Sequence, residues 1–91
     1  MIFDDLKFGP HLNGWKDRIQ ALVFFENGYG ASVIRGEYSY GGRKGLYELA
    51  VIKGIPDEWD LCYDTGLTED VEGYLTPEDV TSWLNRIEAL A

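Results

Sequence analysis

The chain has very little of the chemistry on which most enzymes and metal sites depend. Its 91 residues include one cysteine, Cys62, and one histidine, His11. A lone cysteine excludes a disulfide within the chain and favours a reducing, cytoplasmic compartment. No cluster of cysteine and histidine is present for zinc, and the acids do not follow the spacing of a calcium-binding loop. The sequence therefore predicts no metal site and no cofactor.

Candidate catalytic residues are equally scarce. His11 lies in a Gly/Pro-containing stretch, and no serine or cysteine stands at a spacing that suggests a triad. Cys62 has acidic neighbours, which should raise the pKa of its thiol and disfavour a nucleophile. The glycine-rich stretches 28–30 and 41–45 lack the Lys-Ser/Thr pair of a phosphate-binding loop and precede no predicted helix. We therefore expect no enzyme; a deep pocket joining His11 to carboxylates would favour the alternative of a small enzyme or ligand-binding module.

Long apolar runs are absent as well. The longest, Ala21–Phe25, is far too short to span a bilayer. The first eight residues carry acids where a signal peptide has bases, so we expect neither a leader nor a membrane anchor. Apolar residues nevertheless make up 45% of the chain, including three Trp, six Tyr and four Phe. This is enough for one small core, and residues 1–91 are expected to form a single domain.

The dipeptide Asn27-Gly28 stands between two apolar, β-rich runs, 18–26 and 29–34. Asn-Gly favours a tight type I′ turn, because both central residues of that turn need a positive φ. The two runs are thus predicted to form a β-hairpin, with 18–26 as a central strand. A second hairpin follows, in which the glycine-rich connection 35–45 leads to a return strand at 46–53.

Shorter strands are expected at Ile2–Phe8 and at Glu58–Asp64. In the second of these, Trp59, Leu61 and Tyr63 alternate with residues that are mostly acidic. Such alternation is typical of a half-exposed edge strand with an acidic outer face. The residues of that outer face are Glu58, Asp60, Cys62 and Asp64. The stretch that follows, Thr65–Leu75, is expected to be a loop.

The last segment carries the signals of a helix start. Thr76 is a suitable N-cap, Pro77 suits the first helical position, and two acids follow where the helix dipole favours them. An apolar stripe then recurs at helical spacing, formed by Val80, Trp83, Leu84, Ile87 and Leu90. Together the patterns predict an α+β fold: an antiparallel β-meander of three to five strands with one C-terminal amphipathic helix packed on a face.

Negative charge is concentrated in the second part of the chain. The net charge is −8; residues 1–53 contain seven Lys/Arg and six Asp/Glu, whereas residues 54–91 contain ten Asp/Glu and Arg86 alone. A one-sided field of this kind repels nucleic acid and anionic membranes and attracts basic partners. We therefore expect no direct contact with nucleic acid and none with a membrane.

The strongest candidate site is the acidic segment 54–79. Carboxylates spaced along an edge strand and the next loop can imitate a phosphate track and occupy the basic groove of a nucleic-acid-binding protein. Aromatic residues in the segment could anchor the interface. The predicted partner-binding residues are Asp57, Glu58, Asp60, Asp64, Glu69, Asp70 and Glu72, with Trp59, Tyr63 and Tyr74 as anchors. A solvated acidic face without any partner is the alternative.

A smaller cluster combines aromatic and basic residues that could stack on a base or on a partner's surface. Its members are Tyr29, Tyr38, Tyr40 and Tyr47, with Arg35, Arg43 and Lys44 nearby. Tyrosines that simply pack on the sheet and its loops are the alternative.

Three runs, FENGYGASVIRG, GLYELAVIKG and CYDTGLTEDVEGYLT, resemble small uncharacterised proteins encoded by tailed bacteriophages. The resemblance covers most of the chain, from Phe3 to Ile87. It implies an accessory protein made in the cytoplasm of the host cell, and it carries over no functional residues. Small acidic phage proteins include inhibitors of host defence nucleases and of host polymerases, several of which imitate DNA; this is an analogy between groups of proteins.

The sequence as a whole predicts a phage accessory protein that binds a basic surface of a host protein through its acidic C-terminal half. It would act there as a nucleic-acid mimic or as an inhibitor of host defence. The alternative is a structural or assembly protein that associates with itself, for example as a weak homodimer, through its edge strand and exposed aromatic residues.

Overall fold

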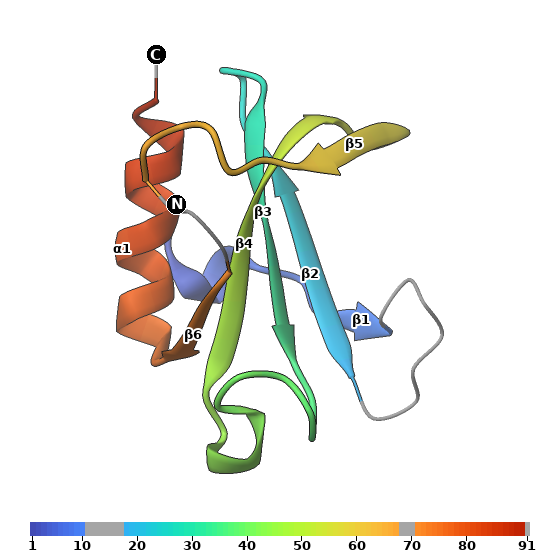
Figure 1. Ribbon diagram of the computed structural model, residues 1–91, viewed down its shortest axis with the longest axis vertical. Coiled ribbons are helices and arrows are strands. Elements are labelled where there is room, and N and C mark those ends of the chain that lie inside the picture. The colour runs from blue at the N-terminus through green and yellow to red at the C-terminus, as the bar shows by residue number, and fades with distance from the viewer. Residues whose placement is uncertain (11–17, 68–70, 91) are drawn as a thin grey trace.

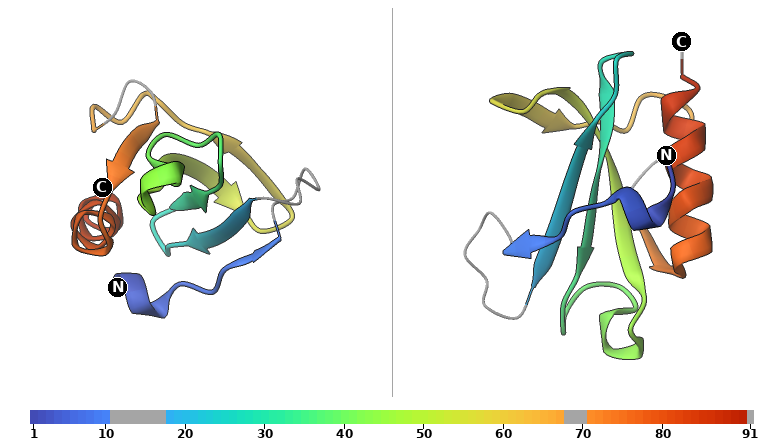
Figure 2. Two further views of the ribbon diagram at one scale, coloured as in Figure 1. Left: turned by 90° about the horizontal axis from the view of Figure 1, so that it is seen from below. Right: turned by 180° about the vertical axis from the view of Figure 1, so that it is seen from behind.

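The computed structural model describes residues 1–10, 18–67 and 71–90. Within these ranges, six antiparallel strands form one sheet in the order β1-β2-β3-β4-β5, and β6 also pairs with β4 (Figure 1). The helix α1 (Pro77–Glu88) packs on one face of the sheet, as Figure 2 shows from two further sides. The strands are β1 (Gly9–Pro10), β2 (Ile19–Phe24), β3 (Tyr29–Arg35), β4 (Tyr47–Ile55), β5 (Glu58–Leu61) and β6 (Glu72–Leu75). The predicted α+β fold with a meander-like sheet and a C-terminal helix is confirmed.

Strand β4 organises the sheet. One of its edges pairs with β3 over most of its length. The opposite edge is shared, because the part from Tyr47 to Leu49 pairs with β6 and the part from Ile52 to Ile55 pairs with β5. The two ends of β4 therefore have different neighbours. We call them the loop end, at Tyr47, and the hairpin end, at Ile55.

Helix α1 starts where the sequence predicts. The Thr76 hydroxyl accepts a hydrogen bond from the Asp79 N–H at 3.2 Å, and the Asp79 carboxylate accepts one from the Thr76 N–H at 3.0 Å. This reciprocal capping box satisfies two backbone N–H groups at the helix start. The predicted apolar stripe faces the sheet, with Val80, Leu84 and Ile87 fully buried and Trp83 and Leu90 partly buried.

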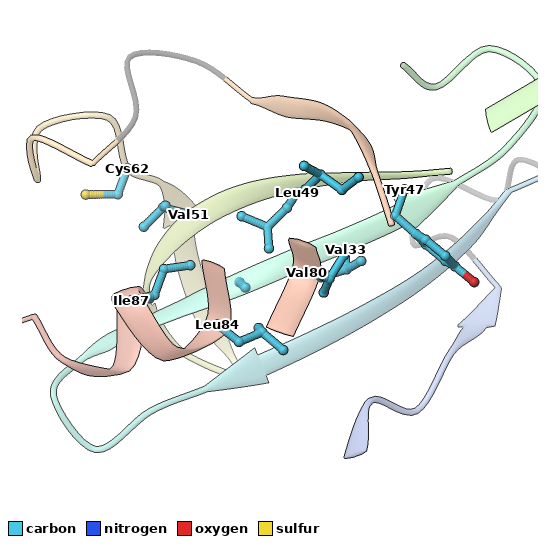
Figure 3. Packing of buried hydrophobic residues seen from close by; sticks show 10 residues of the cluster. Val33, Tyr47, Leu49, Val51, Cys62, Val80, Leu84 and Ile87 are labelled. Atoms are coloured by element: carbon cyan, nitrogen blue, oxygen red, sulfur yellow. The ribbon is translucent and has the colours of Figure 1, made fainter. Parts of the chain in front are cut away.

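The core lies between α1 and the sheet (Figure 3). Val33 of β3 and Leu49 and Val51 of β4 are fully buried against the apolar side chains of α1. Tyr47 closes the core at the loop end, where the Phe3 ring lies 4.9 Å from its own. Burying an apolar side chain of this size stabilises a fold by roughly 1.5–3 kcal/mol. This one cluster therefore holds β4 against the helix from Tyr47 to Val51.

The predicted hairpin between β2 and β3 is confirmed, but the predicted type I′ turn is wrong. Gly28 has a φ of 88°, whereas Asn27 does not have a positive φ. The Phe25 N–H donates to the Tyr29 carbonyl at 2.8 Å, and the Gly28 N–H donates to the Phe25 carbonyl at 3.2 Å. The connection is therefore a three-residue loop that ends with Gly28 in the left-handed region.

Asn27 has another role, because its side chain joins the hairpin to the helix. Its Nδ2 donates to the carbonyl oxygens of Ile87 and Leu90, each at 3.0 Å. Its Oδ1 accepts a hydrogen bond from the Tyr29 N–H at 3.0 Å. Carbonyl groups at the end of a helix lack a full set of partners within it. Asn27 supplies them with a donor and fixes the β2–β3 hairpin against the end of α1.

The expected strand at Ile2–Phe8 is wrong, since Phe3–Asp5 forms a short 3-10 helix, η1. The Asp5 carboxylate accepts a hydrogen bond from the Ile2 N–H at 3.0 Å, and the Phe3 N–H donates to the hydroxyl of Thr81 on α1 at 2.8 Å. Aspartate side chains that bond nearby backbone groups in this way compete with strand pairing. The strand that forms in this region is the two-residue β1.

Part of the expected loop Thr65–Leu75 is strand β6, so the loop prediction is wrong there. The strand is irregular: Tyr74 has a φ of 57°, which is uncommon outside glycine, and the pairing register shifts between Tyr47 and Leu49. The Tyr74 N–H donates to the Tyr40 carbonyl at 3.1 Å. Strand β6 thereby joins the connection between β3 and β4 to the sheet.

Candidate protein-interaction surface

The hairpin end of β4 carries the acids of the expected edge strand. Strand β5 pairs with the last four residues of β4, from Ile52 to Ile55. Gly54 permits this pairing, because its φ is 134° and a Cβ there would lie 2.8 Å from the Cα of Trp59. Strand β5 projects away from α1 in Figures 1 and 2. The hairpin end is therefore left uncovered by the helix.

Four carboxylates lie on this hairpin and just after it. Asp57, Glu58, Asp60 and Asp64 are all exposed, and we call them the acidic hairpin surface. The ion pairs formed within the described part of the chain, Met1 with Glu88 and Arg43 with Glu37, involve none of them. A carboxylate in water needs no ionic partner. Lys53 lies opposite Asp60 in β4 and lines the same groove, but it forms no ion pair with these carboxylates. Most of the charge of this surface is therefore available to another molecule.

The other predicted acids and the predicted anchor Tyr74 do not all join this surface. Glu72 is half-buried at the start of β6, along the same edge of β4. Glu69 and Asp70 lie outside the described residues. Tyr74 lies at the loop end, where its backbone bonds to Tyr40 and its side chain lines a different pocket. The structure thus brings together the β5 part of the predicted site and separates Tyr74 from it.

Apolar side chains accompany the acids. Trp59 is half-buried and Tyr63 is 40% exposed. Two further residues, which were not among the predicted site residues, are more exposed: Ile55 at 61% and Leu61 at 52%. Leu61 pairs with Ile52, whose side chain points to the face of the sheet away from α1, so no helix covers it. For Leu61, the signal available in the sequence was its place next to Asp60 on a short edge strand. Ile55 stands between Gly54 and Pro56 at the end of β4 and gave no such signal.

A groove of about 480 Å³ lies beside β5. The groove is open along the strand, and both charged and apolar side chains line it. Such a groove suits an extended segment of another protein better than a small molecule, which usually binds in an enclosed pocket. The groove is lined by Lys53, Asp60, Leu61, Cys62, Tyr63 and Asp64.

Cys62 lies in the core, and its expected place on the acidic outer face is wrong. Its side of the strand turns toward α1, and only 6% of the residue is exposed. The Cys62 thiol donates a hydrogen bond to Asp64 Oδ1 at 2.9 Å. Burial, followed by this hydrogen bond, raises the pKa of the thiol, and the same bond lowers the pKa of Asp64. A buried, protonated thiol is a poor nucleophile.

The loop end of β4 presents a different surface. Tyr38, Tyr40 and Tyr74 are each more than half exposed. The Arg43 guanidinium lies 5.6 Å from the Tyr38 ring centre, and the Lys44 Nζ lies 5.9 Å from the Tyr74 ring centre. A pocket of about 220 Å³ has Tyr38, Arg43, Lys44 and Tyr74 in its lining. We call the five residues the aromatic loop surface.

The predicted aromatic and basic cluster is therefore divided. Tyr47 is buried, and its hydroxyl accepts a hydrogen bond from Arg35 Nη1 at 3.1 Å. Tyr29 lies toward the hairpin end, where the Lys53 Nζ is 5.6 Å from its ring centre. The members that remain together are those of the connection between β3 and β4, and Tyr74 of β6 joins them.

Other kinds of site find little support in the described ranges. No three His, Cys, Asp or Glu side chains there are placed to hold a metal ion. His11, on which the catalytic alternative depended, lies outside those ranges. Among the described helices, none is long and apolar enough to cross a membrane. No protein-family model, curated protein or solved structure matches the chain.

Proposed function

We propose that this chain is a non-enzymatic bacteriophage accessory protein that binds a basic surface of a host protein in the host cytoplasm. The observation that carries the proposal is the acidic hairpin surface, four exposed carboxylates without an ion-pair partner in the described part of the chain. Such a field attracts a basic surface over distance and speeds association. It opposes direct contact with nucleic acid, whose phosphates have the same sign. The phage origin rests on the resemblance of the three sequence runs.

The arrangement suits a nucleic-acid mimic that inhibits a host defence protein. Carboxylates on a projecting hairpin place negative charge at the edge of the molecule. The basic groove of a partner protein can surround the hairpin there. Ile55, Leu61 and Tyr63 lie among these carboxylates and expose apolar surface. Apolar anchors between charges give an interface a part that excludes water, which charge alone does not provide.

Charge reversal on the hairpin tests the proposal. The variant D57K/D60K changes two exposed acids of the surface, neither of which forms an ion pair within the described residues. The matched control D4K/E78K makes the same change in net charge at exposed positions near the start of α1, where the two residues line another pocket. Each protein is immobilised and used for affinity capture from host lysate at low and high salt.

We expect the wild type and D4K/E78K to retain the same partner at low salt and to release it at high salt. D57K/D60K should lose the partner while still unfolding in one cooperative transition, at a somewhat lower melting temperature because position 60 faces Lys53 across the strands. Recovery of the same partner with D57K/D60K would contradict the proposal. Equal loss with both variants would show that net charge, and not the hairpin, governs binding.

Self-association is the second candidate function, favoured by the exposed tyrosines of the aromatic loop surface. Aromatic residues are enriched in protein interfaces, and an exposed group of them marks a candidate contact. Sedimentation at several protein concentrations separates the two functions. A defined oligomer that persists at high salt would favour assembly, whereas a monomer at all concentrations would favour host binding.

A further inference from the structure

The backbone of β5 shows which of its groups face outward. Partners in an antiparallel pair alternate between those that exchange hydrogen bonds and those that do not. The Cys62 N–H donates to the Val51 carbonyl at 2.8 Å, so Asp60 and Glu58, two and four residues earlier, also direct their backbone groups toward β4. Trp59 and Leu61 must then direct their N–H and C=O groups away from β4.

These outward groups have no backbone partner within the described residues. Trp59 and Leu61 form the non-hydrogen-bonded pairs with Gly54 and Ile52, and no backbone hydrogen bond joins either of them to another described residue. Unpaired N–H and C=O groups along an edge strand are a template on which another strand can pair. The hairpin end thus presents an open strand edge as well as a charged surface.

The side chains of β5 show what kind of strand would fit. Trp59 and Leu61 lie on one face of the strand, and Glu58 and Asp60 lie on the other. Residues directly opposite one another in a sheet share a face and interact. A complementary strand therefore carries apolar residues opposite Trp59 and Leu61 and basic residues on the side of the acids. The groove beside Asp60 and Asp64 offers room for a basic side chain.

A second copy of this chain does not fit the same edge. Pairing β5 with β5 would bring Glu58 and Asp60 of one molecule against the same carboxylates of the other. Like charges directly opposite in a sheet are destabilising, and charged edge residues commonly protect a protein from pairing with itself. Each copy also has a net charge of −8. The acids that exclude a second copy admit a strand of opposite charge.

We propose that β5 is a docking edge for an extended basic segment of the partner protein, which adds to the sheet as a further strand with alternating basic and apolar residues. This inference rests on the proposed function, and it specifies the form in which the basic partner is bound. Main-chain hydrogen bonds to Trp59 and Leu61 hold the segment, and alternate side chains give selectivity, as in other cases of strand addition.

Short peptides test this inference separately from the proposed function. The probe is the acetylated and amidated heptapeptide Lys-Val-Lys-Val-Lys-Val-Lys. Two matched forms have the same charge and differ in which backbone N–H groups are blocked: one is N-methylated on its valines, the other on its inner lysines. In antiparallel addition the valine N–H groups face β5, whereas in parallel addition the lysine N–H groups do.

Titration calorimetry should show that one of the two methylated peptides binds at least about tenfold more weakly than the unmodified peptide, because it loses two or more hydrogen bonds. The other methylated peptide should bind as the unmodified one does. The identity of the weakened peptide gives the orientation of the added strand. Hydrogen exchange of the Trp59 and Leu61 amides should also slow on binding, while that of Asp60, already bonded to β4, should not change.

Equal binding of all three peptides, with no protection of Trp59 and Leu61, would overturn strand addition and leave the electrostatic proposal standing. Failure of every peptide to bind at low salt would count against both strand addition and the electrostatic proposal. Binding that is unaffected by D57K/D60K would contradict the proposed function instead, because the acids would then have no part in recognition.

Discussion

The two ends of β4 carry different surfaces, and they differ in how their charges are used. At the loop end, Arg43 and Lys44 lie over tyrosine rings, and Arg43 also pairs with Glu37 at 3.7 Å. At the hairpin end, the carboxylates of the acidic hairpin surface form no ion pair within the described residues, although Lys53 lies opposite Asp60 in the sheet and lines the same groove. Charges paired within a molecule contribute to local order, whereas unpaired exposed charges act on approaching partners. We therefore assign the paired charges of the loop end mainly to the fold and the carboxylates of the hairpin end mainly to binding.

The largest effect on the free energy of unfolding is expected when a methyl group is added at Gly41, at the loop end. Gly41 has a φ of 90°, and a Cβ there would lie 2.8 Å from the Cα of Tyr74. The substitution Gly41→Ala should therefore cost about 2–4 kcal/mol of unfolding free energy, from backbone strain and overpacking together. The matched control Gly45→Ala also has a positive φ but no atom within 4 Å of its Cβ, so it should cost only about 1 kcal/mol.

Urea denaturation of the two glycine variants checks this prediction. Equal destabilisation would show that the connection between β3 and β4 is not packed against β6 as described. Partner capture by Gly41→Ala, measured under conditions in which it is folded, should match that of the wild type, because the substitution lies at the opposite end of β4 from the acids.

A smaller effect is expected from Asn27, which supports the hairpin end. Its side chain donates to three carbonyl groups at the end of α1, and the neighbouring Gly28 carbonyl accepts a hydrogen bond from the Gly54 N–H at 3.0 Å. Asn27→Ala should cost about 1–2 kcal/mol of unfolding free energy. Asn27→Asp retains an acceptor for the Tyr29 N–H but places a carboxylate against the helix carbonyls, so it should be at least as destabilising. An Asn27→Asp variant as stable as the wild type would contradict the described contacts.

The smallest effect concerns the pH dependence of the hairpin end. The hydrogen bond from Cys62 lowers the pKa of Asp64 in the folded protein. Asp64 therefore contributes stability above the pKa that it has in the unfolded chain, and this contribution is lost as the pH falls through its lower folded-state pKa. Cys62→Ala removes the donor and should raise the pKa of Asp64 toward its ordinary value. Cys62→Ser keeps a donor and should leave that pKa low.

Titration of the Asp64 carboxyl carbon by NMR in the wild type and the two Cys62 variants measures this shift. An unchanged pKa of Asp64 in Cys62→Ala would show that the thiol is not its hydrogen-bond partner. The wild-type thiol, for its part, should react slowly with alkylating reagents until the protein unfolds, because it is buried and its pKa is raised.

Much of the fold was predictable because its signals are local. The N-cap Thr76, the apolar stripe of α1 and the Asn27-Gly28 dipeptide each specify structure within a few residues of themselves. The turn type was not predictable from that dipeptide, because the Asn27 side chain bonds to the end of α1, about sixty residues away. Strand β6 was hidden for a similar reason, since the left-handed Tyr74 bonds to Tyr40 of the connection between β3 and β4, which is distant in sequence.

The candidate site was predictable only in its β5 part. The acids of β5 could be placed from the sequence because their alternation with apolar residues along a short edge strand is a local property. They are exposed in the structure, as predicted. The position of Tyr74 is not local: it follows the acidic segment in sequence but lies at the loop end in space. Cys62 was misplaced because alternation alone does not say which face of a strand is covered by the helix. The predicted cluster of aromatic and basic residues is divided between the two ends of β4. That division likewise depends on strand pairing, which only the structure provides.

The central claim is that the acids of the hairpin end serve a partner and not the fold. The variant D57N/E58Q/D60N removes three charges with little change of shape, and its free energy of unfolding in urea tests the claim most directly. We predict a value equal to that of the wild type or higher by up to about 1 kcal/mol, because mutual repulsion of the carboxylates is relieved. A loss of more than about 1 kcal/mol would contradict the account, since it would show that the carboxylates stabilise the folded protein.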